Sequence, residues 1–131
     1  MTQEKRPNNV VWFELPVTNL DRATSFYESV FGTKLAIDAR FPELAIFPRR
    51  HEQASTGALA VTHDPKHDGR PSTDGVVIYL NCDGDMDGVL KRAKAAGGEL
   101  LQEVAQLPGG MGWIAQFRDL DGNRVGLHAA F

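Results

Sequence analysis

Apolar and polar residues follow two periodic patterns along the chain, and the two patterns recur in the same order in each half. Each half opens with an apolar, β-branched stretch of strand-like length, at residues 10–17 and 76–82. Apolar residues then recur at helical spacing over residues 20–31 and 86–96. The pattern therefore predicts a strand followed by a helix, twice.

The residues at the ends of the predicted helices support this assignment. Asn19 and Asp85 precede the helices, where a side-chain oxygen can accept the first free backbone N–H groups. Gly32 and the pair Gly97–Gly98 follow them, where the chain needs a left-handed residue. After each helix we expect three short strands, at residues 33–38, 44–48 and 58–62 and at residues 99–104, 112–118 and 124–129.

The two halves can be aligned with each other at an offset of 66 residues, which places Asp21 on Asp87 and Gly32 on Gly98. The joint between them is polar and rich in Pro, Gly and Asp, which disfavour regular structure. A unit of half this length buries little core on its own. We therefore predict a single domain over residues 1–131, with a first βαβββ module at 8–63, a connector at 64–73 and a second module at 74–131.

Composition narrows the class of protein further. The 131 residues are 42% hydrophobic and 24% charged, with a net charge of −3, which is typical of a globular domain and argues against nucleic-acid or anionic-membrane partners. Cys82 is the single cysteine, which fits a reducing compartment. The first seven residues lack the apolar core of a signal peptide, and no apolar run approaches the roughly 20 residues of a membrane span. We expect a cytoplasmic protein.

Two segments carry a resemblance to a known family. The first predicted helix reads NLDRATSFYESVFG at residues 19–32, and the last predicted hairpin reads FRDLDGNRVGLH at residues 117–128. In the context of paired βαβββ modules, these segments resemble the vicinal oxygen chelate superfamily, which includes glyoxalase I, bleomycin-resistance proteins and extradiol dioxygenases. The resemblance implies an α+β fold in which two modules form a curled mixed sheet, a cup that holds a divalent metal and the substrate.

The residues at the family's metal-ligand positions depart from its pattern. The resemblance places the first ligand at Trp12, and the repeat places its counterpart at Ile78. The carboxylate ligand of the last strand falls at Gly126, with its first-half counterpart at Ala58 or Ala60. None of these side chains offers the oxygen, imidazole or thiolate donor that a divalent metal needs. We therefore expect no metal cofactor, with a divalent metal ion kept as the alternative.

Strand alternation predicts which residues face the cup, because successive side chains point to opposite faces. Glu14 and His128 are the candidates for proton transfer. Each also has a simpler interpretation: Glu14 as a partner of Arg124, and His128 as a solvated residue at a strand end. Two interpretations are likewise open for Trp12, Trp113 and Phe117, as core filling or as rings on which a ligand stacks. The predicted cup lining is apolar and aromatic with a few polar groups, which is typical of small-molecule sites: Trp12, Glu14, Ile78, Trp113, Phe117, Arg124 and His128.

The sequence is compatible with three functions. The first is a glyoxalase/bleomycin-resistance-like protein that binds a small organic molecule in the cup without a catalytic metal. The second is a metal-dependent lyase or dioxygenase of the glyoxalase type, similar to lactoylglutathione lyase. The third is a non-catalytic interaction module. The resemblance also implies a homodimer, since two-module members of the family commonly pair.

Overall fold

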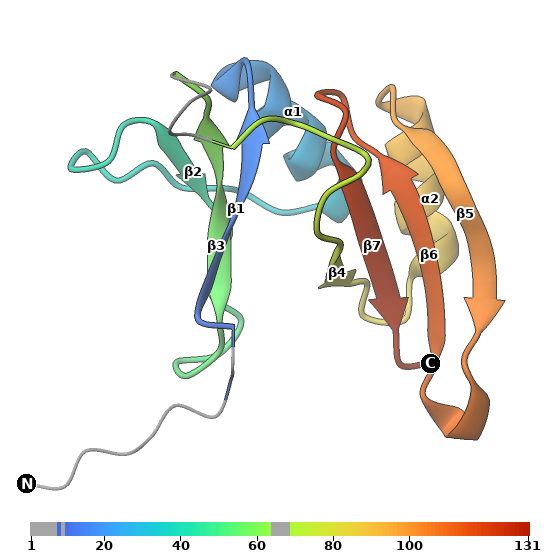
Figure 1. Cartoon of the computed structure of the whole chain (residues 1–131). Coiled ribbons are helices and arrows are strands. Elements are labelled where there is room, and N and C mark those ends of the chain that lie inside the picture. Colours follow the sequence, from blue (N-terminus) through green and yellow to red (C-terminus); the bar gives the residue numbers. More distant parts are fainter. Residues whose placement is uncertain (1–7, 9, 64–68) are drawn as a thin grey trace, which may run out of the picture.

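A computed structural model describes residue 8, residues 10–63 and residues 69–131, so residues 64–68 of the predicted connector lie outside the described residues. The described chain contains two α-helices and two β-sheets (Figure 1). In chain order the elements are β1 (Trp12–Val17), α1 (Leu20–Phe31), β2 (Leu44–Ile46), β3 (Thr56–Val61), β4 (Ile78–Asn81), α2 (Met86–Ala95), β5 (Glu99–Gln106), the short 3₁₀ turn η1 (Pro108–Gly110), β6 (Trp113–Arg118) and β7 (Arg124–Ala129).

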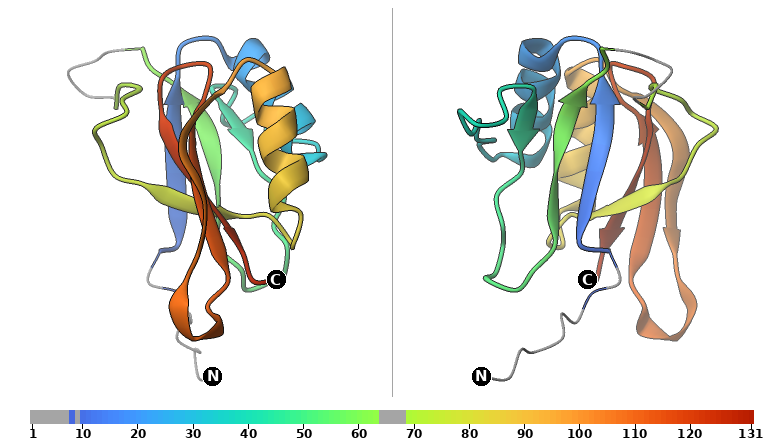
Figure 2. Two further views of the ribbon diagram at one scale, coloured as in Figure 1. Left: turned by 90° about the vertical axis from the view of Figure 1, so that its right-hand side faces the viewer. Right: turned by 60° about the vertical axis from the view of Figure 1, so that its left-hand side comes forward.

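The two sheets have the same strand connectivity. Sheet A has the order β1-β3-β2 and sheet B the order β4-β7-β6-β5. In each, the strand before the helix pairs in parallel with the last strand of the half, β1 with β3 and β4 with β7, and the other pairs are antiparallel. Both helices lie on one side of the sheets (Figure 2). The predicted α+β fold of two related modules is confirmed. Neither described helix is long and apolar enough to cross a membrane.

The strand predicted at residues 33–38 is wrong. Only Ala36 pairs there, in a single bridge to Ile46. Local side chains take backbone donors that a strand would use. The Glu28 carboxylate accepts the N–H of Leu35 at 2.9 Å. Just beyond the predicted strand, the Asp38 carboxylate accepts the N–H of Arg40 at 2.9 Å. Sheet A therefore has one strand fewer than sheet B.

The helix ends follow the sequence signals in part. The Asn19 side chain accepts the backbone N–H of Arg22 at 2.9 Å, and Gly32 ends α1 with a left-handed φ of 62°. Asp85 occupies the N-cap position of α2 but makes no capping hydrogen bond. Its carboxylate accepts instead from Arg92 at 3.1 Å, so α2 is tied to its own first turn by a surface ion pair.

A single buried cluster joins the two halves. Phe26 of α1 packs against Phe117 of β6, with ring centroids 6.1 Å apart. The neighbouring Tyr27 ring meets Phe47 edge-on at 5.7 Å. One helix of the first half thus buries aromatic side chains against both sheets, and burial of such rings is a major stabilising contribution. The largest fully buried side chains of the cluster come from both halves: Val17, Tyr27, Val30, Leu59, Phe117, Val125 and Leu127.

A buried carboxylate fixes the β6–β7 turn to α1. Asp119 is only 2% exposed and accepts the backbone N–H groups of Asp121, Gly122 and Asn123 at 2.9, 3.0 and 2.9 Å. The Tyr27 hydroxyl also donates to it at 2.6 Å. Burial, together with the charge of Asp119, holds the pKa of Tyr27 well above its usual value. The ion is thus surrounded by donors, as a buried charge requires.

Replacing Tyr27 by Phe removes one donor from this buried carboxylate while keeping the ring. We expect the free energy of unfolding to fall by about 1–3 kcal/mol, because the carboxylate stays buried with one partner fewer. Urea denaturation followed by circular dichroism measures the change. Tyr79→Phe is the matched control: the Tyr79 hydroxyl accepts from Gln116 at the surface, and its loss should change stability by no more than about 0.5 kcal/mol. Equal effects of the two variants would contradict this account.

Candidate functional site

The faces of sheets A and B that point away from the helices form the candidate site, and are called the helix-free face below. On β1, Leu15 and Val17 are buried against the helices, so Trp12 and Glu14 belong to the helix-free face. The indole N–H of Trp12 donates to the Glu14 carboxylate at 3.1 Å. Glu14 makes no ion pair with Arg124 in the described part of the chain, so the pairing suggested by the sequence is not formed.

On sheet B, register places one row of polar side chains on the helix-free face. Tyr79 of β4 lies opposite Gly126 of β7, which lies opposite Gln116 of β6. The Gln116 amide donates to the Tyr79 hydroxyl at 2.7 Å, and the Arg124 guanidinium donates to the Gln116 carbonyl oxygen at 2.8 Å. Tyr79 and Gln116 are not among the residues predicted from the sequence, although strand alternation in the correct register places both on this face.

The Tyr79 ring covers Gly126. A Cβ atom built at Gly126 would lie 2.5 Å from a carbon of the ring, so the ring occupies the space of any larger side chain there. Tyr79 is 45% exposed, so its other side is open. Gly126 is the position at which the resemblance places the carboxylate ligand of the last strand. The Tyr79 ring therefore occupies the space that such a side chain would need.

Three of the predicted cup residues lie on the other face. Ile78 pairs with Val125 and packs against the core. Phe117 is 1% exposed, beneath α1, and Trp113 shares its face of β6. Their predicted orientation toward the cup is wrong. Trp12, Glu14, Arg124 and His128 are on the helix-free face as predicted.

The cause of the error for Ile78 is one extra residue in the second half. The helix starts, Leu20 and Met86, lie 66 residues apart, but the core-facing Val17 corresponds to Cys82, 65 residues later. The connection after Cys82 is one residue longer and contains the left-handed residues Asp83 and Gly84, with φ of 51° and 79°. A shift of one residue moves every side chain of a strand to the opposite face.

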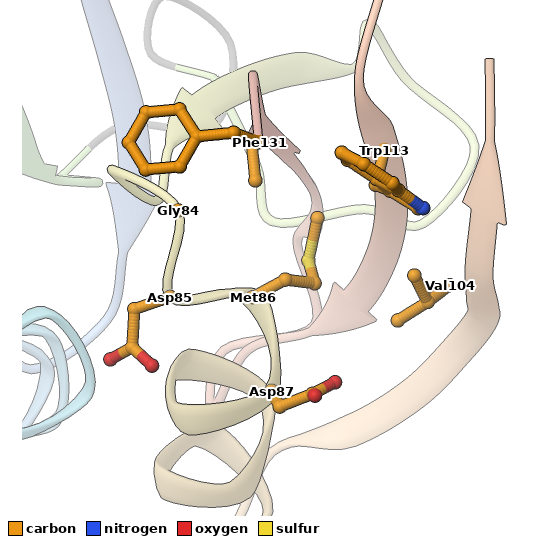
Figure 3. Close-up of a pocket in the computed structure, with 8 residues that line it drawn as sticks. Gly84, Asp85, Met86, Asp87, Val104, Trp113 and Phe131 are labelled. Atoms are coloured by element: carbon orange, nitrogen blue, oxygen red, sulfur yellow. The ribbon is translucent and has the colours of Figure 1, made fainter.

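Trp113 lines a separate hollow of about 270 Å³ on the helix side of sheet B. Figure 3 shows its indole beside Val104 and above Met86, with Asp87 of α2 at the lower edge. Phe131 closes the other side of the hollow. Sheet B separates this hollow from the helix-free face, so Trp113 does not contribute to the candidate site.

His128 contacts the glycine-rich connection between β5 and β6, residues 107–112. Its Nε2 lies 2.7 Å from the carbonyl oxygen of Met111, between β5 and β6. A carbonyl only accepts, so the proton of this hydrogen bond is on Nε2. The neutral ring then carries its free lone pair on Nδ1. His128 therefore ties the hairpin tip to β7, which differs from the solvated strand end considered from the sequence.

Strand pairing also identifies which residue of the first half corresponds to Gly126, the carboxylate-ligand position of the last strand. Glu14 lies opposite Ala58 in sheet A, just as Tyr79 lies opposite Gly126 in sheet B. Ala58, rather than Ala60, is thus the counterpart of Gly126.

Among the described residues, His, Cys, Asp and Glu side chains nowhere gather in a group of three that could hold a metal ion. The donor set at these positions does not fit the divalent metal that the fold family implies.

Cys82 is buried, and burial raises the pKa of its thiol to about 11. Because the thiolate is the reactive form, we expect native protein at pH 8 to react with Ellman's reagent far more slowly than protein unfolded in urea. The raised pKa also means that this group's contribution to stability is lost as pH rises from about 9 toward 11. Equal native and unfolded reaction rates would contradict the burial of this thiol.

Comparison with known proteins places this geometry in a family. Among solved structures, a glyoxalase/bleomycin resistance protein from Albidiferax ferrireducens T118 has a TM-score of 0.71 at 16% identity, covering 93% of this chain and 98% of that chain. A glyoxalase-related enzyme from Fulvimarina pelagi has a TM-score of 0.69 at 19% identity, with coverage of 92% and 87%. TnmS3, an antibiotic binding protein from Streptomyces sp. CB03234, has a TM-score of 0.65 at 21% identity, with coverage of 96% and 98%.

These likenesses are all below 25% identity, so they show a shared fold. The comparison with curated proteins gives no match. The family comparison matches residues 9–127, nearly the whole chain. The chain belongs to the Glyoxalase/Bleomycin resistance protein/Dioxygenase superfamily.

Proposed function

We propose that the protein binds a small organic molecule on its helix-free face and does so without a catalytic metal. The observation that carries this proposal is the Tyr79 ring seated over Gly126, 2.5 Å from where a Cβ would be. In the fold family, this strand position supplies a carboxylate to the metal. Here an aromatic ring fills the same space, and a half-exposed ring is a surface on which a flat organic ligand can stack.

The metal-dependent alternative gains no support from the residues present. A bound divalent metal would polarise a substrate oxygen, but it needs several fixed donors. Trp12, Ala58 and Gly126 offer none in their side chains. Glu14 accepts a hydrogen bond from the Trp12 indole, and His128 offers only its Nδ1 because its Nε2 is bound to the Met111 carbonyl. Neither belongs to a group of three ligating side chains in the described part of the chain. We therefore assign no reaction step to a metal.

The exposed aromatic rings favour a ligand that contains a flat ring. Trp12 is 38% exposed and Tyr79 is 45% exposed, one on each sheet of the helix-free face. Such rings remain in contact with water unless a ligand or partner covers them, and covering them is favourable. The structural likeness to an antibiotic binding protein is consistent with this kind of ligand.

A thermal-shift screen of bleomycin and a panel of flat aromatic molecules tests the proposal. A binder present at about 100 times its Kd stabilises the folded protein by about 2.7 kcal/mol, which raises the melting temperature by several degrees. We expect Tyr79→Ala and Trp12→Ala to abolish the shift, whereas Val104→Ala, on the opposite side of sheet B, should retain it.

Two results would contradict this proposal. One is a binder whose shift is unchanged in both Tyr79→Ala and Trp12→Ala. The other is a purified, tag-free protein that holds one equivalent of a divalent metal per chain by inductively coupled plasma mass spectrometry. The second result would point to the glyoxalase-type alternative.

We also propose that the protein forms a homodimer through two of its edge strands, β1 and β4. β1 and β4 are each at the edge of a sheet, and exposed apolar side chains cluster at their starts. Val10 and Val11 are exposed just before β1, and Val76 is 88% exposed just before β4. Unpaired apolar strand edges tend to pair with another chain.

Light scattering coupled to size-exclusion chromatography measures this assembly. We expect the mass of two chains at micromolar concentration, and a shift toward the mass of one chain in Val76→Glu, because the charge would be buried in the interface. Val104→Glu, an exposed valine on β5, is the matched control and should stay dimeric. A wild-type mass of one chain would overturn the proposal.

A further inference from the structure

Among the described residues, no carboxylate pairs with the positive charge of Arg124. Arg124 lies half-buried at the start of β7, on the helix-free face. Its hydrogen bonds go to neutral oxygens: Nε donates to the Thr73 carbonyl and Nη1 to the Gln116 side chain, both at 2.8 Å. Within the described residues no Asp or Glu forms an ion pair with it. A charge that is partly removed from water without a counter-ion is unfavourable, so a bound anion would stabilise Arg124.

The neighbouring charges make this arrangement specific to Arg124. Arg118 lies directly opposite it on β6 and also faces away from the helices, but Arg118 is paired with Glu99 at 2.7 Å. Glu14, the carboxylate of sheet A on this face, accepts from the Trp12 indole. Two guanidinium groups therefore stand side by side, and only one has its counter-ion.

The two neutral acceptors hold the guanidinium in one orientation. Thr73 precedes β4 and Gln116 belongs to β6, so Arg124 is held from two sides. Gln116 is itself fixed through the Tyr79 hydroxyl. Nη2 has no partner among the described residues, so its donors are free. A planar guanidinium with free donors and a fixed orientation binds carboxylates well, because little side-chain freedom is lost on binding.

We infer that Arg124 is a specificity residue for a ligand that carries a carboxylate next to a flat ring. The inference rests on the proposed function and deepens it. The carboxylate accepts hydrogen bonds from the free donors of Arg124, while the ring of the same molecule stacks on Tyr79. Tyr79 and Arg124 are linked through Gln116, so the two groups are within reach of one small molecule.

The test compares 2-naphthoate with its neutral isostere 2-naphthamide by isothermal titration calorimetry. In the wild type we expect naphthoate to bind at least about tenfold more tightly than naphthamide, because a charge-assisted hydrogen bond contributes more than a neutral one. Arg124→Gln should remove this difference by weakening naphthoate alone. Arg118→Gln is the matched control, since it removes an equal charge that already has a partner, and it should largely retain the preference for naphthoate.

The outcomes separate this inference from the proposed function. If naphthoate and naphthamide bind equally and Tyr79→Ala abolishes both, the helix-free face binds ligands but the carboxylate specificity is wrong. If Arg124→Gln and Arg118→Gln reduce naphthoate affinity equally, general electrostatic attraction explains the binding rather than a specific contact with Arg124, and the inference also fails. If neither molecule binds the wild type, both the inference and the aromatic binding surface are overturned. Circular dichroism of each variant verifies that it is folded.

Discussion

The buried carboxylate of Asp119 is the interaction on which the arrangement of the two halves depends. It accepts hydrogen bonds from three backbone N–H groups of the β6–β7 turn and from the Tyr27 hydroxyl of α1. The amide of Asn123, in the same turn, donates both to Asp119 and to the backbone carbonyl of Pro16 in β1. A buried charge must keep its donors, so α1, β1 and the last hairpin are held in one fixed arrangement.

This constraint also shapes the candidate site. With the β6–β7 hairpin held beneath α1, Phe117 and Val125 must point into the core, and their strand neighbours Gln116 and Arg124 must point away from it. The same pairing brings Tyr79 of β4 over Gly126. The polar row that we propose for ligand recognition is thus the opposite side of the strands that form the core, and its geometry follows from core packing.

Much of the fold was predictable because its signals are local. Asn19 and Gly32 mark the ends of α1, and the turn around Asp119 separates two strands found close to their expected bounds. The strand expected at residues 33–38 did not form because the Glu28 carboxylate binds the backbone N–H of Leu35, and the Asp38 carboxylate binds that of Arg40 just beyond it. Such competition between side chain and backbone depends on conformations that periodicity does not report.

The sequence by itself determined the repeated strand–helix pattern, the ends of α1 and the absence of ligating side chains at Trp12 and Gly126, because these depend on residue type and short-range spacing. Only the tertiary structure placed Tyr79 and Gln116 on the helix-free face, and Ile78, Trp113 and Phe117 on the opposite one. One extra residue after Cys82 leaves the helices in register but turns Ile78 into the core and Tyr79 out of it. Alternation along a strand has a period of two, so a single inserted residue, invisible in composition and compatible with the repeat, reverses every assignment of the strand.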